Sequence, residues 1–358
     1  MKRIKRVQEQ LDSWGVDQLI VDSPIDLYYL TGMELSVGRL VIGREKAELF
    51  VDARYIESCQ KRSPIPVFLT QGYREGSGFR KQCPFARKKV GFDAFYTSYH
   101  HFKELESIGA ELVALEEPIV NIRMIKDAEE VALLKDAASL ASQGYDYLVD
   151  AFKEGMSEEE SALLVELFWR QSGGEKLSFS PIIAFGENTS QPHYRSGKRV
   201  LKKGDLILVD IGVTKQHYCS DMTRVFAAGS APEPFQEIYQ IVWEAKEAAG
   251  RLARPGVSMK ELDSAAREWI AKAGYGAFFT HGLGHGVGLE VHELPIVKAI
   301  SPYGGRLLEE GMVITIEPGI YLPDKGGVRL EDTLVITKTG AETLTLFPIP
   351  HTIPLIGC

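Results

Sequence analysis

The sequence predicts an α+β protein of two domains: a small α/β domain in residues 1–121 and a larger domain of helices and antiparallel strands in residues 122–358. Three observations lead to this fold class. The chain has 358 residues, which favours two domains over one. Short strand-like segments before Asn121 give way to longer helical patterns after it. A faint repeat indicates that the second domain contains a duplicated unit.

The first domain begins with a helix and continues with strands. Four apolar residues at helical spacing predict the helix, namely Ile4, Val7, Leu11 and Trp14. Gly15 is placed to end it. Strand-like segments follow at residues 18–21, 39–42 and 47–51. Residues 73–89 are rich in Lys and Arg and are interpreted as a solvated loop, with an interface or a contact to a substrate carboxylate as the alternative.

Four helices are predicted in the second domain. Three of them have a capping box, in which a Ser or Asp is followed three residues later by Glu. These boxes are Asp127 with Glu130, Ser157 with Glu160, and Ser258 with Glu261. A fourth helix is expected after Pro234, where apolar residues again recur at helical spacing.

Two of these helices belong to the repeat. The segment that starts at Gly155 resembles the one that starts at Gly256, a constant offset of 101 residues. Each copy precedes a predicted hairpin that carries two acidic residues. We therefore expect two halves related by a pseudo-two-fold axis, which would bring all four carboxylates to one centre.

The first acidic pair lies in strand-like surroundings. Asp210 follows the apolar run at residues 206–209, and Asp221 lies in a second strand-like segment. A reversal about Lys215 and Gln216 would make a hairpin in which Asp210 faces Asp221. Like charges across a ladder are destabilising, and burial of an unpaired carboxylate costs more. This arrangement therefore requires a counter-ion.

The second acidic pair repeats the pattern. Residues 313–317 and 328–336 are strand-like, and a reversal between them would place Glu317 across from Glu331. Residues 318–319 are Pro and Gly, which favour a bulge there. One acidic pair alone would more often be solvated or paired with Lys or Arg. Two such pairs beside a histidine-rich segment favour a metal site.

That segment, residues 281–292, contains His281, His285 and His292 among four alternating glycines. The glycines argue against a helix, so His281 and His285 are not a zinc pair one helical turn apart. Irregular backbone instead allows imidazoles to approach a centre closely. Four of the five histidines outside this segment are interpreted as structural, namely His100, His101, His217 and His351.

Composition excludes several classes of function. The formal net charge of −8 argues against nucleic acid as the main partner. No apolar core follows the basic N-terminus, and no apolar run of 18 residues occurs, so neither a secretory signal nor a membrane span is expected. The four cysteines are scattered without CxxC spacing, which is typical of free thiols in a reducing cytoplasm. We therefore expect a cytoplasmic protein.

Four carboxylates and one imidazole can bridge two hard divalent ions. Oxygen-rich ligand sets favour manganese, with cobalt, zinc or iron(II) also compatible. Two ions about 3.5 to 4 Å apart can hold a bridging water and lower its pKa, so the site would hydrolyse its substrate. The expected metal ligands are Asp210, Asp221, His285, Glu317 and Glu331.

Five ordered motifs resemble the pita-bread metallopeptidases, in particular the Xaa-Pro aminopeptidase and Xaa-Pro dipeptidase group. These motifs occupy residues 209–212, 218–224, 281–292, 316–319 and 328–332. Residues 29–32 and 52–55 resemble the N-terminal domain of the same group, and the similarity extends roughly from residue 4 to residue 347. The resemblance implies a pita-bread catalytic domain in residues 122–358 and a creatinase/prolidase-like domain in residues 1–121.

The resemblance also implies roles for individual residues. Asp221 and Glu331 would bridge the two metals, and Glu317 would also move a proton to the leaving nitrogen. Substrate contact and stabilisation of the oxyanion would come from His193 and His292, and His281 matches another substrate-pocket histidine. Arg329 would orient Glu331 from the same strand face, although a plain structural ion pair explains it equally well.

The function that we favour is removal of the N-terminal residue from peptides with proline second, the activity of an Xaa-Pro aminopeptidase. The alternative is an Xaa-Pro dipeptidase; no residue in the sequence could be assigned to clamp the C-terminal carboxylate of a dipeptide. A methionine aminopeptidase would lack the extra N-terminal domain, while a creatinase-like hydrolase or a binding module would lack ligands. The expected partners are proline-containing peptides and a second copy in a homodimer, without nucleic acid or membrane.

Overall fold

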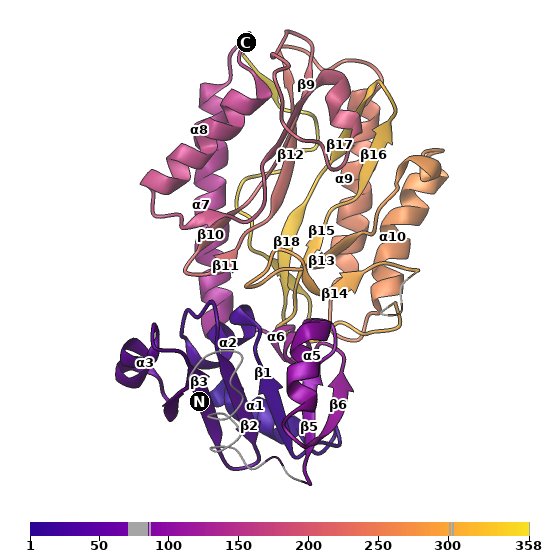
Figure 1. Ribbon diagram of the computed structural model, residues 1–358. Helices are drawn as coiled ribbons and strands as arrows, with labels where there is room; N and C mark the ends of the chain where they lie inside the picture. The colour runs from indigo at the N-terminus through magenta and orange to yellow at the C-terminus, as the bar shows by residue number, and fades with distance from the viewer. Residues whose placement is uncertain (71–84, 86, 301, 303, 358) are drawn as a thin grey trace. The chain divides into compact units, whose positions relative to one another are not determined.

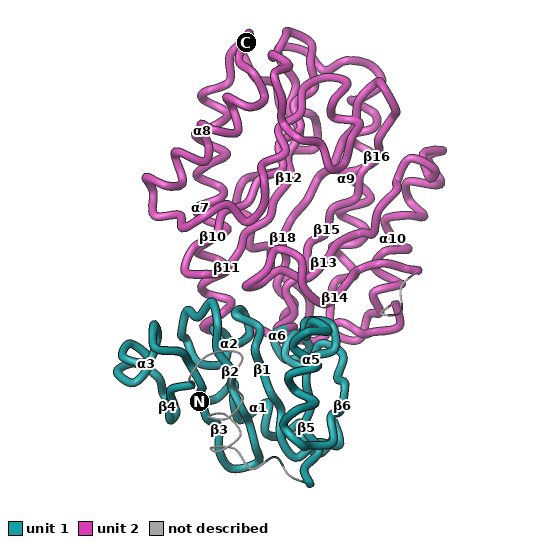
Figure 2. The backbone as a smooth tube through the Cα atoms, in the orientation of Figure 1, with its two compact units in different colours: residues 1–123 teal, residues 124–358 magenta. Residues whose placement is uncertain are grey.

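The computed structural model describes residues 1–70, 85, 87–300, 302 and 304–357. The chain forms two compact units, Met1–Arg123 and Met124–Cys358 (Figure 2). The boundary expected from the sequence, between residues 121 and 122, lies close to this division. Most of the basic segment at residues 73–89 lies outside the described residues.

The first unit is built on a six-stranded mixed sheet with the order β4-β3-β2-β1-β5-β6 (Figure 1). Its strands are β1 (Gln18–Val21), β2 (Arg39–Gly43), β3 (Ala47–Val51), β4 (Val67–Leu69), β5 (Lys89–Asp93) and β6 (Glu111–Leu115). Its helices are α1 (Lys2–Gln10), α2 (Pro24–Thr31), α3 (Ile56–Arg62), α5 (Tyr99–Glu106) and α6 (Pro118–Arg123). The strands predicted at residues 18–21, 39–42 and 47–51 are confirmed. Helix α1 ends at Gln10, and Gly15 adopts the left-handed conformation.

The second unit contains the four predicted helices. They are α7 (Ala128–Ala151), α8 (Glu158–Gln171), α9 (Phe235–Leu252) and α10 (Met259–Lys272). All three capping boxes are present, since each N-cap side chain accepts from the backbone of the Glu that bonds back to it. Helices α8 and α10 begin at residues 158 and 259, which confirms the offset of 101.

Within the described residues of the second unit, the strands form four sheets. The larger two have the orders β20-β12-β9-β8 and β14-β13-β15-β18-β19. The strands in the first half are β7 (Lys176–Leu177), β8 (Ile182–Phe185), β9 (Leu206–Ile211), β10 (Val213–Lys215), β11 (Tyr218–Cys219) and β12 (Met222–Ala228). The others are β13 (Gly284–Gly286), β14 (Glu293–Val297), β15 (Val313–Ile316), β16 (Gly319–Leu322), β17 (Gly326–Arg329), β18 (Asp332–Ile336), β19 (Ala341–Thr343) and β20 (Leu355–Ile356). Short 3₁₀ helices lie at Gly186–Ser190 (η1) and Gly276–Phe278 (η2).

Two helix pairs flank these strands. Helices α7 and α8 lie on one side of the strands, and α9 and α10 lie on the other (Figure 1). Each pair precedes an antiparallel pair of strands, β9 with β12 and β15 with β18. This arrangement is the duplicated helix and sheet that the sequence predicted.

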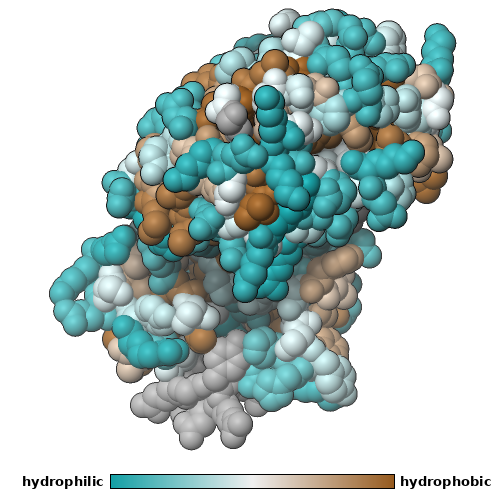
Figure 3. All heavy atoms as spheres, turned by 90° about the horizontal axis from the view of Figure 1, so that it is seen from above, coloured by the Kyte–Doolittle hydropathy of each residue, from teal (hydrophilic) through white to brown (hydrophobic). Residues whose placement is uncertain are grey.

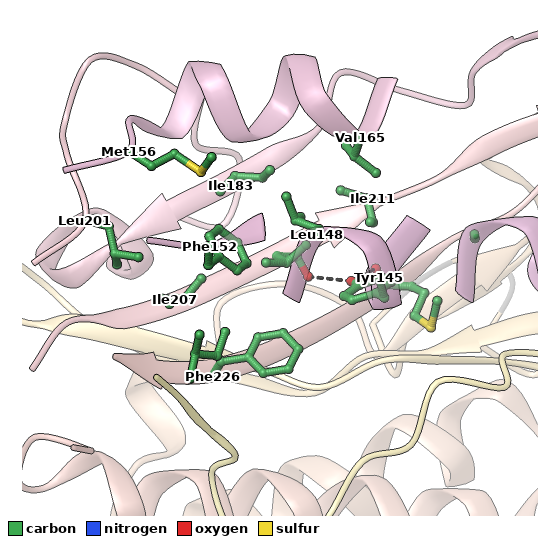
Figure 4. Close-up of a cluster of buried hydrophobic side chains, with 14 of the residues drawn as sticks. Tyr145, Leu148, Phe152, Met156, Val165, Ile183, Leu201, Ile207, Ile211 and Phe226 are labelled. Atoms are coloured by element: carbon green, nitrogen blue, oxygen red, sulfur yellow. Dashed lines mark hydrogen bonds between the residues drawn. The ribbon is translucent and has the colours of Figure 1, made fainter. Parts of the chain in front are cut away.

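Helix α7 fixes the first of these strand pairs through a buried tyrosine (Figure 4). Tyr145 is fully buried, and its hydroxyl lies 2.7 Å from the carbonyl oxygens of both Val209 and Met222. One side chain therefore joins β9 to β12. Val209 directly precedes Asp210, so this core also fixes the backbone of a predicted ligand.

In the view of Figure 3, apolar side chains form separate patches among hydrophilic ones. Within the part of the chain that the structure describes, no helix is both long enough and apolar enough to cross a membrane.

Candidate metal centre

One cavity of about 760 Å³ in the second unit brings together every residue that the sequence predicted for the site. Its lining includes Asp210, Asp221, His285, Glu317 and Glu331, together with His193, His281, His292 and Arg329. The histidines predicted to be structural, His100, His101, His217 and His351, are absent from the lining. The residues come from both halves of the duplicated unit.

The predicted register of the aspartate hairpin is wrong by two residues. Asp210 pairs with Thr223, and Lys215 pairs with Tyr218. The reversal lies at Gln216 and His217, which both have positive φ, as a two-residue hairpin turn of type I′ requires. Asp221 therefore lies between β11 and β12, diagonal to Asp210 rather than opposite it, and both side chains still reach the cavity.

The predicted register of the glutamate pair is confirmed. Ile316 pairs with Asp332, and Gly319 pairs with Arg329, in one continuous register. Glu317 and Glu331 lie between these two pairs, at positions that face each other where the ladder is interrupted. Strands β16 and β17 extend the same hairpin beyond them.

His285 lies at the centre of β13, beside glycines that permit a close approach of strands. A Cβ atom on Gly284 would lie 2.1 Å from the carbonyl oxygen of Thr315 in β15. The imidazole Nε2 is 3.5 Å from Asp221 Oδ2 and 3.3 Å from Glu317 Oε1. Asp221, His285 and Glu331 each offer a ligand atom, and these atoms all lie within 4.8 Å of one another.

Burial gives this cluster unusual protonation. The pKa values of Asp221 and Glu331 lie well above their usual range because of burial and then the neighbouring carboxylates. Burial also raises the pKa of Glu317 to about 8 and lowers that of His285 to about 4. Asp210 adds a buried Oδ1 atom that has no hydrogen-bond partner. Such a donor set fits divalent cations, which would neutralise the carboxylates and satisfy this oxygen.

Arg329 contacts Asp210 rather than Glu331, which corrects the role expected from the sequence. Its Nη2 donates to Asp210 Oδ2 at 2.5 Å. The link to Glu331 is indirect: Arg329 Nε donates to Thr223 Oγ1, and this hydroxyl donates to Glu331 Oε2 at 2.6 Å. Arg329 is only 3% exposed, so its charge acts within the cluster.

Three further residues of the site were missed by the sequence analysis. The Tyr321 hydroxyl accepts from Arg329 Nη1 at 3.0 Å and lies 2.8 Å from His281 Nε2. The Thr315 hydroxyl accepts from the backbone of His285 and donates to Glu317 at 3.2 Å. Thr223 is the third. Strand periodicity was the available signal, because Thr223 and Thr315 lie two residues from Asp221 and Glu317.

The other imidazoles line the same cavity from different segments. His292 is exposed, and its ring centroid lies 4.2 Å from that of His285. Burial lowers the pKa of His281 to about 4, so this ring is neutral near pH 7. His193 lies on the segment between η1 and β9, and its side chain is exposed to the cavity.

Residues 132–338 match the metallopeptidase family M24, and residues 3–125 match the creatinase/prolidase N-terminal domain. The chain therefore belongs to metallopeptidase family M24, and it is a hydrolase of peptide bonds. The N-terminal match separates it from a methionine aminopeptidase in the way that the sequence predicted.

Relatives resemble the chain over nearly its whole length. The Xaa-Pro dipeptidase of Pyrococcus furiosus is 37% identical over 347 residues, which cover 96% of this chain and 97% of that protein. The solved Xaa-Pro dipeptidase from Bacillus anthracis is 31% identical, with a TM-score of 0.93 and coverage of 99% of both chains. The solved X-Pro aminopeptidase from Thermotoga maritima is also 31% identical, with a TM-score of 0.88 and coverage of 98% of this chain and 99% of that one.

Proposed function

We propose that this protein is an Xaa-Pro dipeptidase, which splits dipeptides that end in proline. The observation that carries the proposal is the full-length similarity to proteins described as Xaa-Pro dipeptidases, combined with a buried cluster of four acids and a histidine. The comparisons therefore favour the alternative that the sequence analysis placed second. The Xaa-Pro aminopeptidase that we had favoured becomes the second candidate.

Two positively charged side chains in the cavity support a substrate with a free carboxylate. Arg195 and Lys298 both line the cavity and are both exposed. Neither forms an ion pair with any residue that the structure describes. The aliphatic stem of Lys298 lies against Gly282, where an added Cβ would be 3.3 Å from Lys298 Cβ. We assign these two side chains to the C-terminal carboxylate of the dipeptide, a group that the sequence alone could not match to any residue.

Asp210, Asp221, His285, Glu317 and Glu331 would hold the metal ions that the family implies. This oxygen-rich ligand set suits hard divalent ions and favours manganese among them. When bound, such ions polarise the carbonyl group of the substrate and make water a stronger nucleophile at neutral pH. The raised pKa values of the acids support this assignment, since a cation removes the cost of their shared negative charge.

The chain's own residues would do the rest. His193 and His292 would orient the substrate and donate hydrogen bonds to the oxygen on which charge develops. Glu317 would pass a proton to the leaving proline nitrogen. Arg329 and Tyr321 would hold Asp210 and His281 in place, because each contacts one of them directly.

Selectivity for proline would come from shape. The proline nitrogen in an Xaa-Pro bond has no N–H, so the pocket needs no acceptor there. Apolar side chains of Phe179, Ile182 and Ile296 line the cavity and are suited to the ring. His285 pairs with Ile296 across β13 and β14, so this apolar side chain lies beside a proposed ligand.

Product analysis tests the proposal. Ala-Pro, Ala-Pro-Ala and Ala-Ala are incubated with the manganese-loaded protein, and the products are identified by mass spectrometry. We expect rapid cleavage of Ala-Pro, with little cleavage of the other two. Preference for Ala-Pro-Ala would favour the aminopeptidase, for which the Thermotoga maritima structure gives support. Equal cleavage of all three would end the proline assignment.

The homodimer and the cytoplasmic location remain predictions. The first rests on the commonness of symmetric dimers, and the second on the scattered cysteines. Of these, Cys59 and Cys219 are free and buried in the structure. Sedimentation of the purified protein measures the first directly.

A further inference from the structure

Glu158, the first residue of α8, is a buried carboxylate outside the metal cluster. The residue has no exposed surface, and it forms no ion pair with the residues that the structure describes. Its two oxygens accept four hydrogen bonds instead. This number fills the acceptor capacity of a carboxylate.

The four donors lie on both sides of His193 in the sequence. Glu158 Oε1 accepts from the backbone of Phe185 and from Asn188 Nδ2, both at 2.9 Å. Glu158 Oε2 accepts from the Tyr194 hydroxyl at 2.7 Å and from the backbone of Gly197 at 3.0 Å. The Glu158 carboxylate thus joins the two ends of the loop formed by residues 185–197, which carries His193.

Additional contacts make this loop a single unit. Asn188 Nδ2 also donates to the Tyr194 hydroxyl at 2.8 Å, so the two side chains that bind Glu158 also bind each other. The backbone of Glu159 donates to the carbonyl of Gly197 at 2.9 Å. On the cavity side, Arg329 Nη1 donates to the carbonyl of Pro192, although this contact is long at 3.4 Å.

We propose that Glu158 is a positioning residue for His193, whose imidazole it holds at the substrate cavity through Tyr194 and Gly197. The inference rests on the proposed function, in which His193 contacts the substrate. Glu158 itself does not line the cavity, so any effect on turnover must pass through the loop. Displacement of a substrate-contacting group by about 1 Å can cost about a hundredfold in rate.

A double-mutant cycle on the metal-loaded full chain tests this role. Glu158→Gln keeps the size of the side chain but turns an NH₂ group towards two donors. We expect kcat for Ala-Pro to fall about tenfold to a hundredfold, with bound metal unchanged. In the His193→Ala background the same change should lower kcat by less than twofold, because the residue through which Glu158 acts is gone. A full additional loss in that background would overturn the proposal.

Two neighbours provide matched controls. Glu159→Gln removes an exposed charge from the same helix turn, and Glu160→Gln weakens the capping box without touching the loop. Both variants should retain wild-type kcat. A loss equal to that of Glu158→Gln would show that a weakened α8 is the cause, which would overturn the proposal.

Hydrogen exchange provides a readout that does not depend on the substrate. Glu158→Gln should accelerate exchange in residues 185–197 and leave residues 206–228, which carry Asp210 and Asp221, unchanged. Unchanged exchange in the loop would refute the positioning role even if Ala-Pro is not the substrate. Absence of Ala-Pro cleavage by the wild-type protein, with accelerated exchange in the variant, would instead refute only the proposed function.

Discussion

Asp221 has two properties that conflict when no cation is bound. Burial, and then the charges of the neighbouring Glu331 and Asp210, raise the pKa of its carboxyl group well above the usual range. A ligand must be deprotonated to bind a metal ion, so metal binding has to displace a proton. The proximity of these acids therefore destabilises the metal-free fold.

Asp221→Asn removes the negative charge of this side chain, so it relieves the repulsion between the acids and also weakens metal binding. We expect the variant to lose turnover, because a proposed ligand is neutralised, and to bind less metal. The metal-free variant should unfold at a higher temperature than the metal-free wild type at pH 8. In a domain of this size, each kcal/mol of relieved repulsion raises the midpoint by roughly 2–4 °C. Calorimetry with a chelator and elemental analysis measure both effects; near-native turnover without added metal would contradict the ligand role.

Arg195→Ala and Lys298→Ala test recognition of the substrate carboxylate. Each change should raise KM for Ala-Pro about tenfold, which corresponds to one ordinary charged contact, and the double change should raise it further. The control substrate is Ala-Pro amide, which lacks the carboxylate and should show little change. Steady-state kinetics of both substrates with each variant decide the matter. An equal increase in KM for Ala-Pro amide would show that Arg195 and Lys298 do not bind the carboxylate of the substrate.

At the scale of elements, the close contact of β13 with β15 places His285. Gly284 has no room for a side chain, since its added Cβ would lie 2.1 Å from Thr315 O and 2.7 Å from Thr315 Oγ1. This hydroxyl is also the group that contacts both His285 and Glu317. The separation of the two strands therefore sets the distance between an imidazole and a carboxylate.

Gly284→Ala should push these strands apart. We expect a loss of about 1–3 kcal/mol in the free energy of unfolding, as for other overpacked cores, together with weaker metal binding. Gly250→Ala in α9 is the matched control, because nothing lies within 4 Å of its added Cβ. That change should stabilise the protein by about 0.5–1 kcal/mol, as expected within a helix. Urea denaturation and metal titration of both variants test the pair; unaltered metal binding in Gly284→Ala would contradict this account.

Local signals predicted some elements well and others poorly. The three capping boxes were predicted correctly because each is contained within four residues. The register of the aspartate hairpin was wrong by two residues because its turn lies one residue later, at Gln216 and His217, and contains none of the Gly, Asn or Asp residues that usually mark such a turn. The pairing of β20 with β12 joins segments over a hundred residues apart, and no local pattern indicates it.

At the scale of the whole molecule, pH should govern the stability of the metal-free protein. Below about pH 6.5, the histidines and the acids have opposite effects on the stability. The folded state binds fewer protons than the unfolded state at buried histidines such as His285, and more protons at the carboxyl groups whose pKa is raised. Above about pH 6.5 these histidines are neutral in both the folded and the unfolded state, so only the acids with raised pKa values make the stability depend on pH. Glu317, with its pKa of about 8, then makes the folded state bind more protons than the unfolded state.

We therefore expect the free energy of unfolding of the metal-free protein to fall as pH rises from about 6.5 to 8. Excess manganese should abolish this decline, because cations stabilise the deprotonated carboxylates. Urea denaturation at several pH values, with chelator or with manganese, measures the difference. A stability that rises with pH in the chelated protein would show that these acids are ionised without metal.

The composition of the site was more predictable than its internal contacts. Acidic residues in apolar strands and histidines among glycines are visible in any sequence, and all nine predicted residues line one cavity. The pairing of Arg329 with Asp210 was not predictable, because it joins strands from the two halves of the duplicated unit. Tyr321 was missed because its contact with His281 joins two segments that lie 40 residues apart in the sequence.

The contact between Arg329 and Asp210 makes the four acids unequal. One oxygen of Asp210 is already engaged by a guanidinium, whereas the other has no partner. An ion beside Asp210 would thus share this carboxylate with a guanidinium, whereas among the described residues Asp221, Glu331 and His285 form no hydrogen bond or ion pair with Arg329. In the proposed two-metal site, gradual chelation should consequently withdraw the ions in separate stages, and the one nearer the guanidinium should leave first.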